Sequence, residues 1–391
     1  MPSLTAQITA ASFCRFLLNT ARRFPYPYAP ALSRGMDVPL AAVTSLIAVN
    51  QVTGLLSLLF GPMADRWGYR IMLFAGLGSL AAGMLGGALL PWYIVVLIGL
   101  FLAGLGKSMF DPALQAYVGE RVPFRRRGLV VGFMETVWAG STLIGVPLIG
   151  LLIAHFGWRA PFYALGACAL LGMGALWLMI PAGGTDRGGA SARLSMLSAW
   201  KRLMRQRPGL GMLGFAFFIS MANDNFFVVY GAWMEQSFNL TVVTLGMTTM
   251  IIGGAELLGE TLTASLGDRI GLQRSMCIGL VLSTGSYLLL PAVEHSLPAA
   301  LGALFCVFLF TEFAIVAALS VSTEVMPDAR ATMMSGYLAA ASLGRVIGAL
   351  MGGLIWTLGG LAAVATVSTS INAMALISFL WGLRSWASRR G

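Results

Sequence analysis

The feature that most limits the fold of this chain is a succession of apolar runs, each about twenty residues long. Such a run can cross the roughly 30 Å hydrocarbon core of a bilayer as one α-helix. Of 391 residues, 58% are hydrophobic and 10% are charged, and the mean hydropathy is +0.82. These values exclude a soluble protein. The sequence therefore predicts an all-α membrane protein without a separate soluble domain.

The runs predict twelve membrane-spanning helices. The first residues lack a charged segment followed by a small-residue cleavage site, so they are interpreted as the start of the first helix and not as a signal peptide. The predicted spans are 7–33, 40–61, 70–90, 93–119, 128–154, 160–181, 209–235, 243–265, 273–292, 298–324, 332–357 and 361–383.

Basic residues are distributed unequally between the two sides of these spans. One side holds 18 Lys and Arg residues, whereas the other holds Arg34 and Arg159. Because cytoplasmic loops carry the excess, both termini and the central loop are predicted to be cytoplasmic. The abundance of arginine over lysine suggests a GC-rich bacterial genome, and hence an inner-membrane protein. The 18 are Arg66, Arg70, Arg121, Arg125, Arg126, Arg127, Arg187, Arg193, Lys201, Arg202, Arg205, Arg207, Arg269, Arg274, Arg330, Arg384, Arg389 and Arg390.

This distribution also explains the net charge of +10. The charge is a signal of topology and gives no reason to expect nucleic acid; anionic lipid headgroups are the expected partners. Nothing indicates an enzyme, a cofactor or a metal site, because there is no nucleophile–base pair, metal cluster or phosphate-binding glycine loop. The cysteines and histidines occur singly, at Cys14, Cys168, Cys277, Cys306, His155 and His295.

A short polar break occurs twice, about two hundred residues apart. Residues 61–70 read Gly-Pro-Met-Ala-Asp-Arg-Trp-Gly-Tyr-Arg, and residues 267–271 repeat the pattern as Gly-Asp-Arg-Ile-Gly. Aligning Asp65 with Asp268 also aligns the flanking apolar runs. A Gly-rich polar linker with an amphipathic segment, 182–208, separates the halves 1–181 and 209–391. Within them Asp37 aligns with Asn239, and Gly145 with Gly348.

The duplicated break resembles the signature loop of the major facilitator superfamily. This resemblance implies two pseudo-symmetric six-helix bundles, a substrate site near the midplane and transport by alternating access. It also implies a gating role for the loop, in which Asp65 pairs with Arg127 of the next cytoplasmic loop. The expected gating residues are Gly61, Asp65, Arg66, Gly68, Arg70, Arg127, Asp268 and Arg269.

Two further patterns resemble proton-coupled exporters of this superfamily. Residues 157–162, Gly-Trp-Arg-Ala-Pro-Phe, match a turn found after the fifth helix, and Gly140, Gly145, Pro147 and Gly150 partly match a Gly-Pro-rich motif. Glycines at four-residue spacing also permit close helix packing. Packing is therefore the alternative interpretation of these fifth-span glycines, and also of the glycines in the eleventh span. The exporters' usual fourth-helix arginine is absent, because Leu100 stands in its place.

Charged residues within the spans are candidates for function, since they are costly in a membrane. Five cations and six carboxylates nearly balance, so the whole-chain charge selects neither an anionic nor a cationic substrate. Lys107 and Asp111, four residues apart, are expected to pair. Glu260 lies near the cytoplasmic end and fits the latch. The candidates for proton coupling are Asp224, first, and then Glu135, Glu256 and Glu312.

Polar residues recur every three or four positions along the first span and form one stripe: Arg15, Asn19, Arg22 or Arg23, and Tyr26. Adjacent side chains point about 100° apart on a helix, so one arginine alone is expected to follow the stripe fully. The seventh span contributes a polar triplet and a tyrosine two turns later. The expected substrate-binding residues are Asn19, Arg22, Arg23, Tyr26, Gln51, Trp138, Asn223, Asn225, Tyr230 and Arg345.

The leading hypothesis is a proton-coupled exporter of small amphipathic molecules, resembling the drug/proton antiporter and sugar-efflux branch and acting as a monomer. The alternatives are an organic-anion importer or facilitator, a lipid translocase, and a transporter-like protein that acts as a sensor without flux.

Overall fold

The computed structural model describes residues 3–122, 134, 136–180, 201, 203–326 and 330–384. Every regular element in these ranges is a helix, as the apolar runs predict. The chain divides into two compact units. Unit 1 comprises Met1–Gly188 and Leu240–Gly253, and unit 2 comprises Gly189–Asn239 and Gly254–Gly391.

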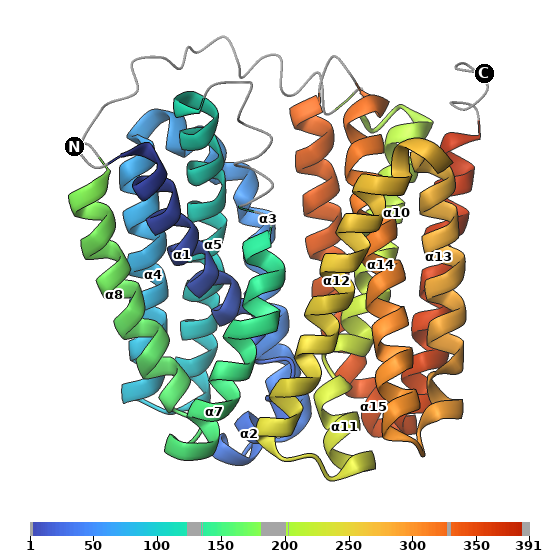
Figure 1. Cartoon of the computed structure of the whole chain (residues 1–391), viewed down its shortest axis with the longest axis horizontal. Coiled ribbons are helices and arrows are strands. Elements are labelled where there is room, and N and C mark those ends of the chain that lie inside the picture. Colours follow the sequence, from blue (N-terminus) through green and yellow to red (C-terminus); the bar gives the residue numbers. More distant parts are fainter. Residues whose placement is uncertain are drawn as a thin grey trace. The chain divides into compact units, whose positions relative to one another are not determined.

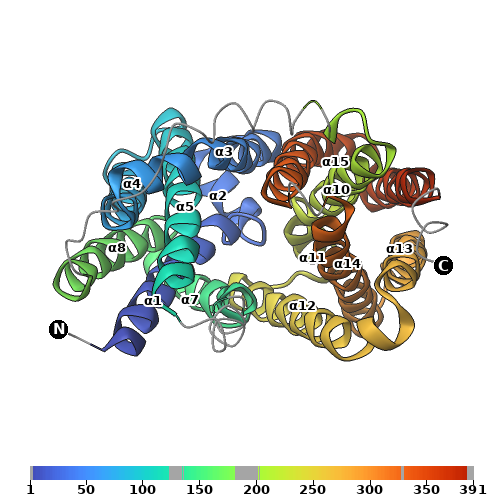
Figure 2. The same cartoon turned by 90° about the horizontal axis from the view of Figure 1, so that it is seen from above.

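Unit 1 is built around α5, which packs against α1, α3 and α4 (Figure 2). α4 and α1 also run beside α8 (Figure 1). The helices of this unit are α1 (Leu4–Arg23), α2 (Ala29–Met36), α3 (Leu40–Trp67), α4 (Tyr69–Leu89), α5 (Tyr93–Arg121), the π-helix η1 (Ser141–Gly145), α7 (Val146–Phe156) and α8 (Ala160–Met179).

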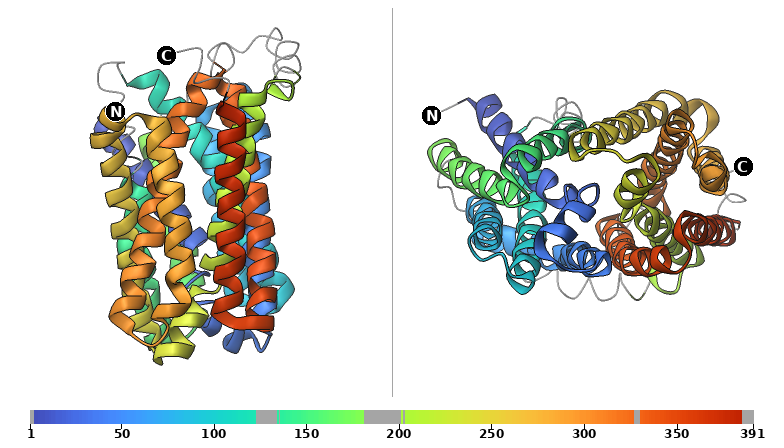
Figure 3. Two further views of the ribbon diagram at one scale, coloured as in Figure 1. Left: turned by 90° about the vertical axis from the view of Figure 1, so that its right-hand side faces the viewer. Right: turned by 90° about the horizontal axis from the view of Figure 1, so that it is seen from below.

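Unit 2 is dominated by the packing of α10 along α15 and of α13 along α14. α15 bends at Gly359 and Gly360, so that it forms two spans; its second arm (red) stands beside α13 in the left panel of Figure 3. The elements are α10 (Arg207–Phe227), α11 (Tyr230–Phe238), α12 (Val242–Ile270), α13 (Leu272–Leu289), the 3₁₀-helix η2 (Leu290–Val293), α14 (Leu297–Val325) and α15 (Arg330–Leu383). The first part of α12 clusters with unit 1.

Each of the twelve predicted spans overlaps helices in the described residues, and the start of the fifth, residues 128–133 and 135, lies outside those residues. Nine described segments are long and apolar enough to cross a membrane, or ten if α2 and the start of α3 form one bent span. One of the nine, Thr332–Leu383, contains both arms of α15. α1 occupies the first predicted span but is not among the nine, because Arg15, Arg22 and Arg23 lower its hydropathy. The protein is an all-α, multi-pass membrane protein.

The first and seventh spans break at matching places. α1 is followed by a turn that contains Pro25 and Pro27, which lack the backbone N–H that a continuing helix needs, and α2 then begins. α10 and α11 are likewise separated by a short turn, formed by Val228 and Val229 and therefore without proline. α2 and α11 both end on a left-handed residue, Asp37 (φ 54°) and Asn239 (φ 51°), the two non-glycine residues with positive φ in the described part of the chain. The sequence alignment of these two residues thus has a backbone counterpart.

Glycines set the distance between α10 and α15. A Cβ atom added to any of three glycines spaced by four residues would lie 2.1–2.4 Å from a backbone carbonyl oxygen of α10, and these oxygens are also spaced by four. One face of each helix therefore runs against the other without intervening side chains, which supports the packing interpretation of the eleventh-span glycines. The pairs are Gly344 with Phe217, Gly348 with Met221, and Gly352 with Asn225.

Candidate functional site

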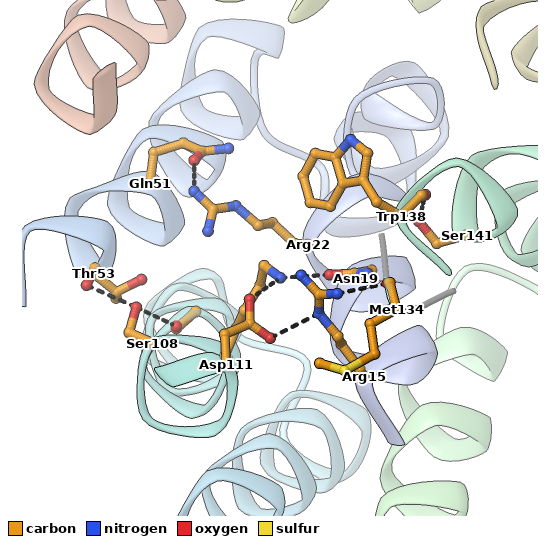
Figure 4. Close-up of polar contacts among 12 residues, drawn as sticks. Arg15, Asn19, Arg22, Gln51, Thr53, Ser108, Asp111, Met134, Trp138 and Ser141 are labelled. Carbon is orange, nitrogen blue, oxygen red and sulfur yellow. Dashed lines mark hydrogen bonds and ion pairs between the residues drawn. The ribbon is translucent and has the colours of Figure 1, made fainter. Parts of the chain in front are cut away.

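A network of buried polar side chains occupies the interior of unit 1 (Figure 4). It is built on the polar stripe of α1: Arg15, Asn19, Arg22 and Arg23 are each at most 9% exposed. α3, α5 and the segment before η1 supply the partners. The stripe predicted from spacing is therefore an interior face of α1, and three groups of contacts extend from it.

The first group joins α1 to α5 through Asp111. Arg15 Nε lies 3.3 Å from Asp111 Oδ1, and Lys107 Nζ lies 2.5 Å from Asp111 Oδ2. Lys107 Nζ also donates to Asn19 Oδ1 at 2.5 Å, and Arg15 Nη1 donates to the carbonyl oxygen of Met134 at 2.6 Å. The expected Lys107–Asp111 pair is confirmed, but it belongs to a larger network that crosses between helices.

The second group joins α1 to α3. Arg22 Nη2 donates to Gln51 Oε1, and Gln51 Nε2 donates to Tyr26 Oη at 2.5 Å. The neighbouring Asn50 instead donates to the carbonyl oxygen of Leu100 at 2.7 Å and ties α3 to α5. Of the two adjacent amides in α3, Gln51 belongs to the network and Asn50 holds two helices together.

The third group lies around Arg23. Its Nη1 donates to Thr142 Oγ1, and its guanidinium carbon lies 4.0 Å above the centre of the Trp138 ring. Lys107 Nζ lies 5.3 Å from the same ring centre. Two cations thus share the Trp138 π-system. Arg22 is directed towards α3 and Arg23 towards the Trp138–Thr142 segment, as expected for adjacent side chains that point about 100° apart. Which of the two follows the stripe fully remains a prediction.

The irregular backbone at Thr142 contributes to this geometry. Residues Ser141–Gly145 form a π-helix, in which the N–H of Val146 bonds to the carbonyl oxygen of Ser141. Pro147 lacks the N–H that would otherwise bond to Leu143, which favours the wider turn. Such single π-turns are frequent at functional sites. Thr142 was not among the expected substrate-binding residues, and Pro147 is the signal in the sequence that marks it.

Unit 2 places its acidic residues differently. Asp224 in α10 is 3% exposed, and its Oδ2 lies 3.9 Å from Arg345 Nε of α15. Glu256 in α12 is also buried. A Cβ atom on Gly259, three residues later, would lie 3.0 Å from the Cβ atom of Glu312. Glu256 of α12 and Glu312 of α14 therefore lie near the place where these two helices cross.

The other predicted residues of the seventh span separate into different roles. Asn225 donates to Ser368 Oγ at 2.9 Å and to the carbonyl oxygen of Val364 at 3.3 Å, which ties α10 to α15. Tyr230 is buried and stacks on Phe227. The side-chain oxygen of Asn223 is buried without a hydrogen-bond partner in the described residues. Of the predicted triplet, Asp224 is the residue with an ion pair in the structure.

The duplicated break is built alike in both units. Gly68 (φ 90°) precedes α4 and Gly271 (φ 92°) precedes α13, so the repeated glycine occupies the same left-handed region. α3 and α12 run to Trp67 and Ile270, past their predicted ends, and the Asp-Arg pair lies in the last helical turn.

The gating residues are described only in part. Arg70 donates to the carbonyl oxygen of Trp177 and lies over that ring, and Arg269 is exposed. Two predicted residues, Glu135 and Arg127, lie outside the described residues, and so do the side chains of Asp65, Arg66 and Asp268. The predicted latch between Asp65 and Arg127 remains a prediction. No group of three or more metal-ligating side chains occurs in the described part of the chain.

Comparison with known proteins identifies the family. A sequence model of the Major Facilitator Superfamily matches residues 11–222 and 212–390. The chain is 23% identical over 303 residues to the uncharacterized MFS-type transporter YceJ of Bacillus subtilis, covering 77% of this chain and 76% of that protein. It is 23% identical over 381 residues to the "multi-drug resistance efflux pump PmrA homolog" of Lactococcus lactis, covering 94% and 91%.

The fold has a counterpart among solved structures. A bacterial homolog of the human lysosomal transporter Spinster, in an inward-facing and unoccupied conformation, superimposes with a TM-score of 0.81 at 15% identity. The match covers 99% of this chain and 98% of that one. At this identity the likeness shows the fold alone.

Proposed function

This chain belongs to the major facilitator superfamily, and we propose that it is a secondary active transporter that exports a small organic molecule in exchange for protons. The relative named as a multi-drug resistance efflux pump supports efflux, as does the resemblance of residues 157–162 to the exporters' turn. Alternating access between two bundles would carry the molecule across the membrane.

Proton coupling rests on Asp224. Desolvation raises the pKa of a carboxyl group and a nearby cation lowers it. Asp224 is buried, and its ion pair with Arg345 is long, at 3.9 Å. A conformational change that alters this distance changes the proton affinity of Asp224, which is sufficient to exchange a proton against substrate. Glu256, Glu312 and Glu135 are the further candidates.

The test is a flux measurement in proteoliposomes that contain a pH-sensitive dye. A library of sugar acids, sugar phosphates, neutral sugars and lipophilic cations is added outside, and internal pH is followed together with radiolabel uptake. We expect transported compounds to move protons in the opposite direction. Uptake without any proton movement would replace exchange by facilitated diffusion, and absence of uptake for the whole library would contradict transport of small molecules.

The duplicated breaks are proposed to control gating. Asp65→Asn should then lower the turnover rate more than substrate affinity, because a latch acts on the exchange between conformations and not on the bound molecule. Asp37→Asn, an exposed acidic residue of the same unit, is the matched control. Lost binding with full turnover would contradict this role.

Both termini are proposed to be cytoplasmic, on the basis of the 18-to-2 distribution of basic residues. A reporter enzyme fused after Gly391 should be active on the cytoplasmic side, and activity confined to the outside would contradict this orientation.

A further inference from the structure

The charges of unit 1 do not balance. Away from their ends, its predicted spans contain four cations and two carboxylates, one of which, Glu135, lies outside the described residues. Counting both carboxylates as ionised and paired still leaves two positive charges in excess. Charges that are not neutralised are costly inside a bundle, and a bound oxyanion would reduce this cost. The cations are Arg15, Arg22, Arg23 and Lys107, and the second carboxylate is Asp111.

The structure brings all four cations to one place. Lys107 connects two of the contact groups, since its ammonium contacts Asp111 and Asn19 and also lies 5.3 Å from the Trp138 ring centre, over which Arg23 is placed. Arg22 and Arg23 donate to the neutral acceptors Gln51 and Thr142. An oxyanion can replace a neutral acceptor with a stronger, charge-assisted hydrogen bond, and a guanidinium fork can grip it with two.

The same geometry disfavours a cation. The π-system of Trp138 is already used by Arg23 and Lys107. Asp111, the described carboxylate of the network, is held by Arg15 and Lys107. A cationic ligand would therefore meet four like charges, and two of these already lie over the Trp138 ring.

We propose that Arg22, Arg23 and Lys107 form a binding site for the carboxylate or phosphate group of a small organic anion, and that the transported substrates belong to this class. Asp111 and Arg15 position Lys107 and do not contact the ligand. This inference rests on the proposed transport function and names its substrate class.

The test measures ligand binding to the purified protein in lipid nanodiscs, by thermal shift followed by calorimetry. The probes are gluconate and other sugar acids, glucose 6-phosphate and other sugar phosphates, the neutral polyol sorbitol, and the lipophilic cation tetraphenylphosphonium. We expect an anion to stabilise the protein most. Its Kd should rise at least about tenfold in each of Arg22→Gln, Arg23→Gln and Lys107→Gln, because hydrogen bonds to charged groups are the strong ones.

Matched controls separate the site from general charge effects. Arg159→Gln removes a positive charge from an exposed residue of the same unit and should leave the Kd unchanged, whereas Arg22→Lys should retain part of the affinity. A carboxylate and a phosphate source are distinguished by whether the sugar acids or the sugar phosphates bind more tightly.

Three results would overturn the site. These are that tetraphenylphosphonium is the strongest ligand, that no anion of the set binds, or that anion binding survives the three substitutions. A variant that fails to fold is replaced by the conservative change at the same position, Arg22→Lys, Arg23→Lys or Lys107→Arg. If the anion site were overturned but a neutral or cationic compound were still taken up together with proton movement, the proposed transport function would remain supported.

Discussion

The interiors of unit 1 and unit 2 carry opposite charge on closely similar frameworks. Away from the ends of the predicted spans, unit 1 holds four cations and two carboxylates, whereas unit 2 holds Arg345 and four carboxylates: Asp224, Glu256, Glu260 and Glu312. The broken first and seventh spans, the left-handed ends at Asp37 and Asn239, and the turn glycines Gly68 and Gly271 are duplicated faithfully. Backbone geometry is thus preserved between the halves while the interior chemistry differs.

This difference is lost when the charges are counted over the whole chain. Five cations and six carboxylates nearly cancel and indicate no preference for either charge. Assigned to their units, they favour an oxyanion site in unit 1 and proton-binding carboxylates in unit 2. Each assignment can be tested by substitutions within its own unit.

The largest effect is expected at Asp224 of unit 2. Asp224→Asn preserves volume and hydrogen bonding but removes the titrating group, so coupled transport should be lost and substrate exchange should become independent of pH. Ligand binding in unit 1 should persist. The measurement is the pH dependence of radiolabel exchange in proteoliposomes, with Glu256→Gln and Glu312→Gln alongside. If Asp224→Asn still accumulates substrate, one of these two carries the proton instead. Normal transport by all three variants, and by Glu135→Gln, would exclude proton coupling.

The second prediction concerns one substitution in each unit, which removes a carboxylate from the mainly positive interior of unit 1 or the cation from the mainly negative interior of unit 2. Asp111→Asn leaves Arg15 and Lys107 without their shared carboxylate and should lower the free energy of unfolding by about 3 kcal/mol. Arg345→Gln should cost less, about 1 kcal/mol, because its pair with Asp224 is longer and its side chain is 29% exposed. Denaturant titration in detergent measures both, and Asp37→Asn is the neutral control. Equal losses of unfolding free energy in the two variants would contradict this prediction, because the Asp111 ion pairs and the Asp224–Arg345 ion pair would then stabilise the protein equally.

The third prediction compares glycines that align between the halves. Gly348→Ala places a Cβ 2.4 Å from the carbonyl oxygen of Met221, so backbone must move and the loss should be about 2 kcal/mol. Gly145→Ala meets side-chain atoms of Thr20 and Phe16 and no backbone atom among its nearest neighbours; side chains shift more easily than backbone, so it should cost about half as much. Thermal unfolding of both variants gives the order. A larger loss for Gly145→Ala would mean that unit 1 is the more rigid.

The smallest effects concern the turn glycines. Gly68→Ala and Gly271→Ala each put a side chain at φ near 90°, which should cost about 1 kcal/mol, equally in both units. The helical glycines Gly78 and Gly285 have open space where a Cβ would stand, so alanine there should be neutral or stabilising. Melting temperatures of the four variants test this. If Gly68→Ala and Gly271→Ala lowered the melting temperature by clearly different amounts, the two breaks would share a backbone conformation but not its contribution to stability.

Much of the candidate site was predictable from periodicity. The stripe of α1 follows from spacing, Gln51 was selected because an amide within a span can hydrogen-bond a ligand, and Trp138 because it shares a helix face with Glu135. Arg15, Lys107 and Thr142 were not among the selected residues. Arg15 and Lys107 acquire their importance from helix packing that brings α1 to α5, and Thr142 from a π-turn that the helical period does not reveal.

The membrane class, the number of spans and the internal duplication could be predicted from the sequence, because these depend on hydrophobic length and on local patterns along the chain. The two repeated glycines were predicted as well, but the breaks within spans 7–33 and 209–235 were not, because an apolar run does not show where its helix is interrupted. Which charges meet became clear only from the packing of the helices. Side chains on one helix face point at whatever helix packs against it, so the opposite courses of Arg22 and Arg23, and the pairing of Asp224 with Arg345, depend on contacts between distant segments.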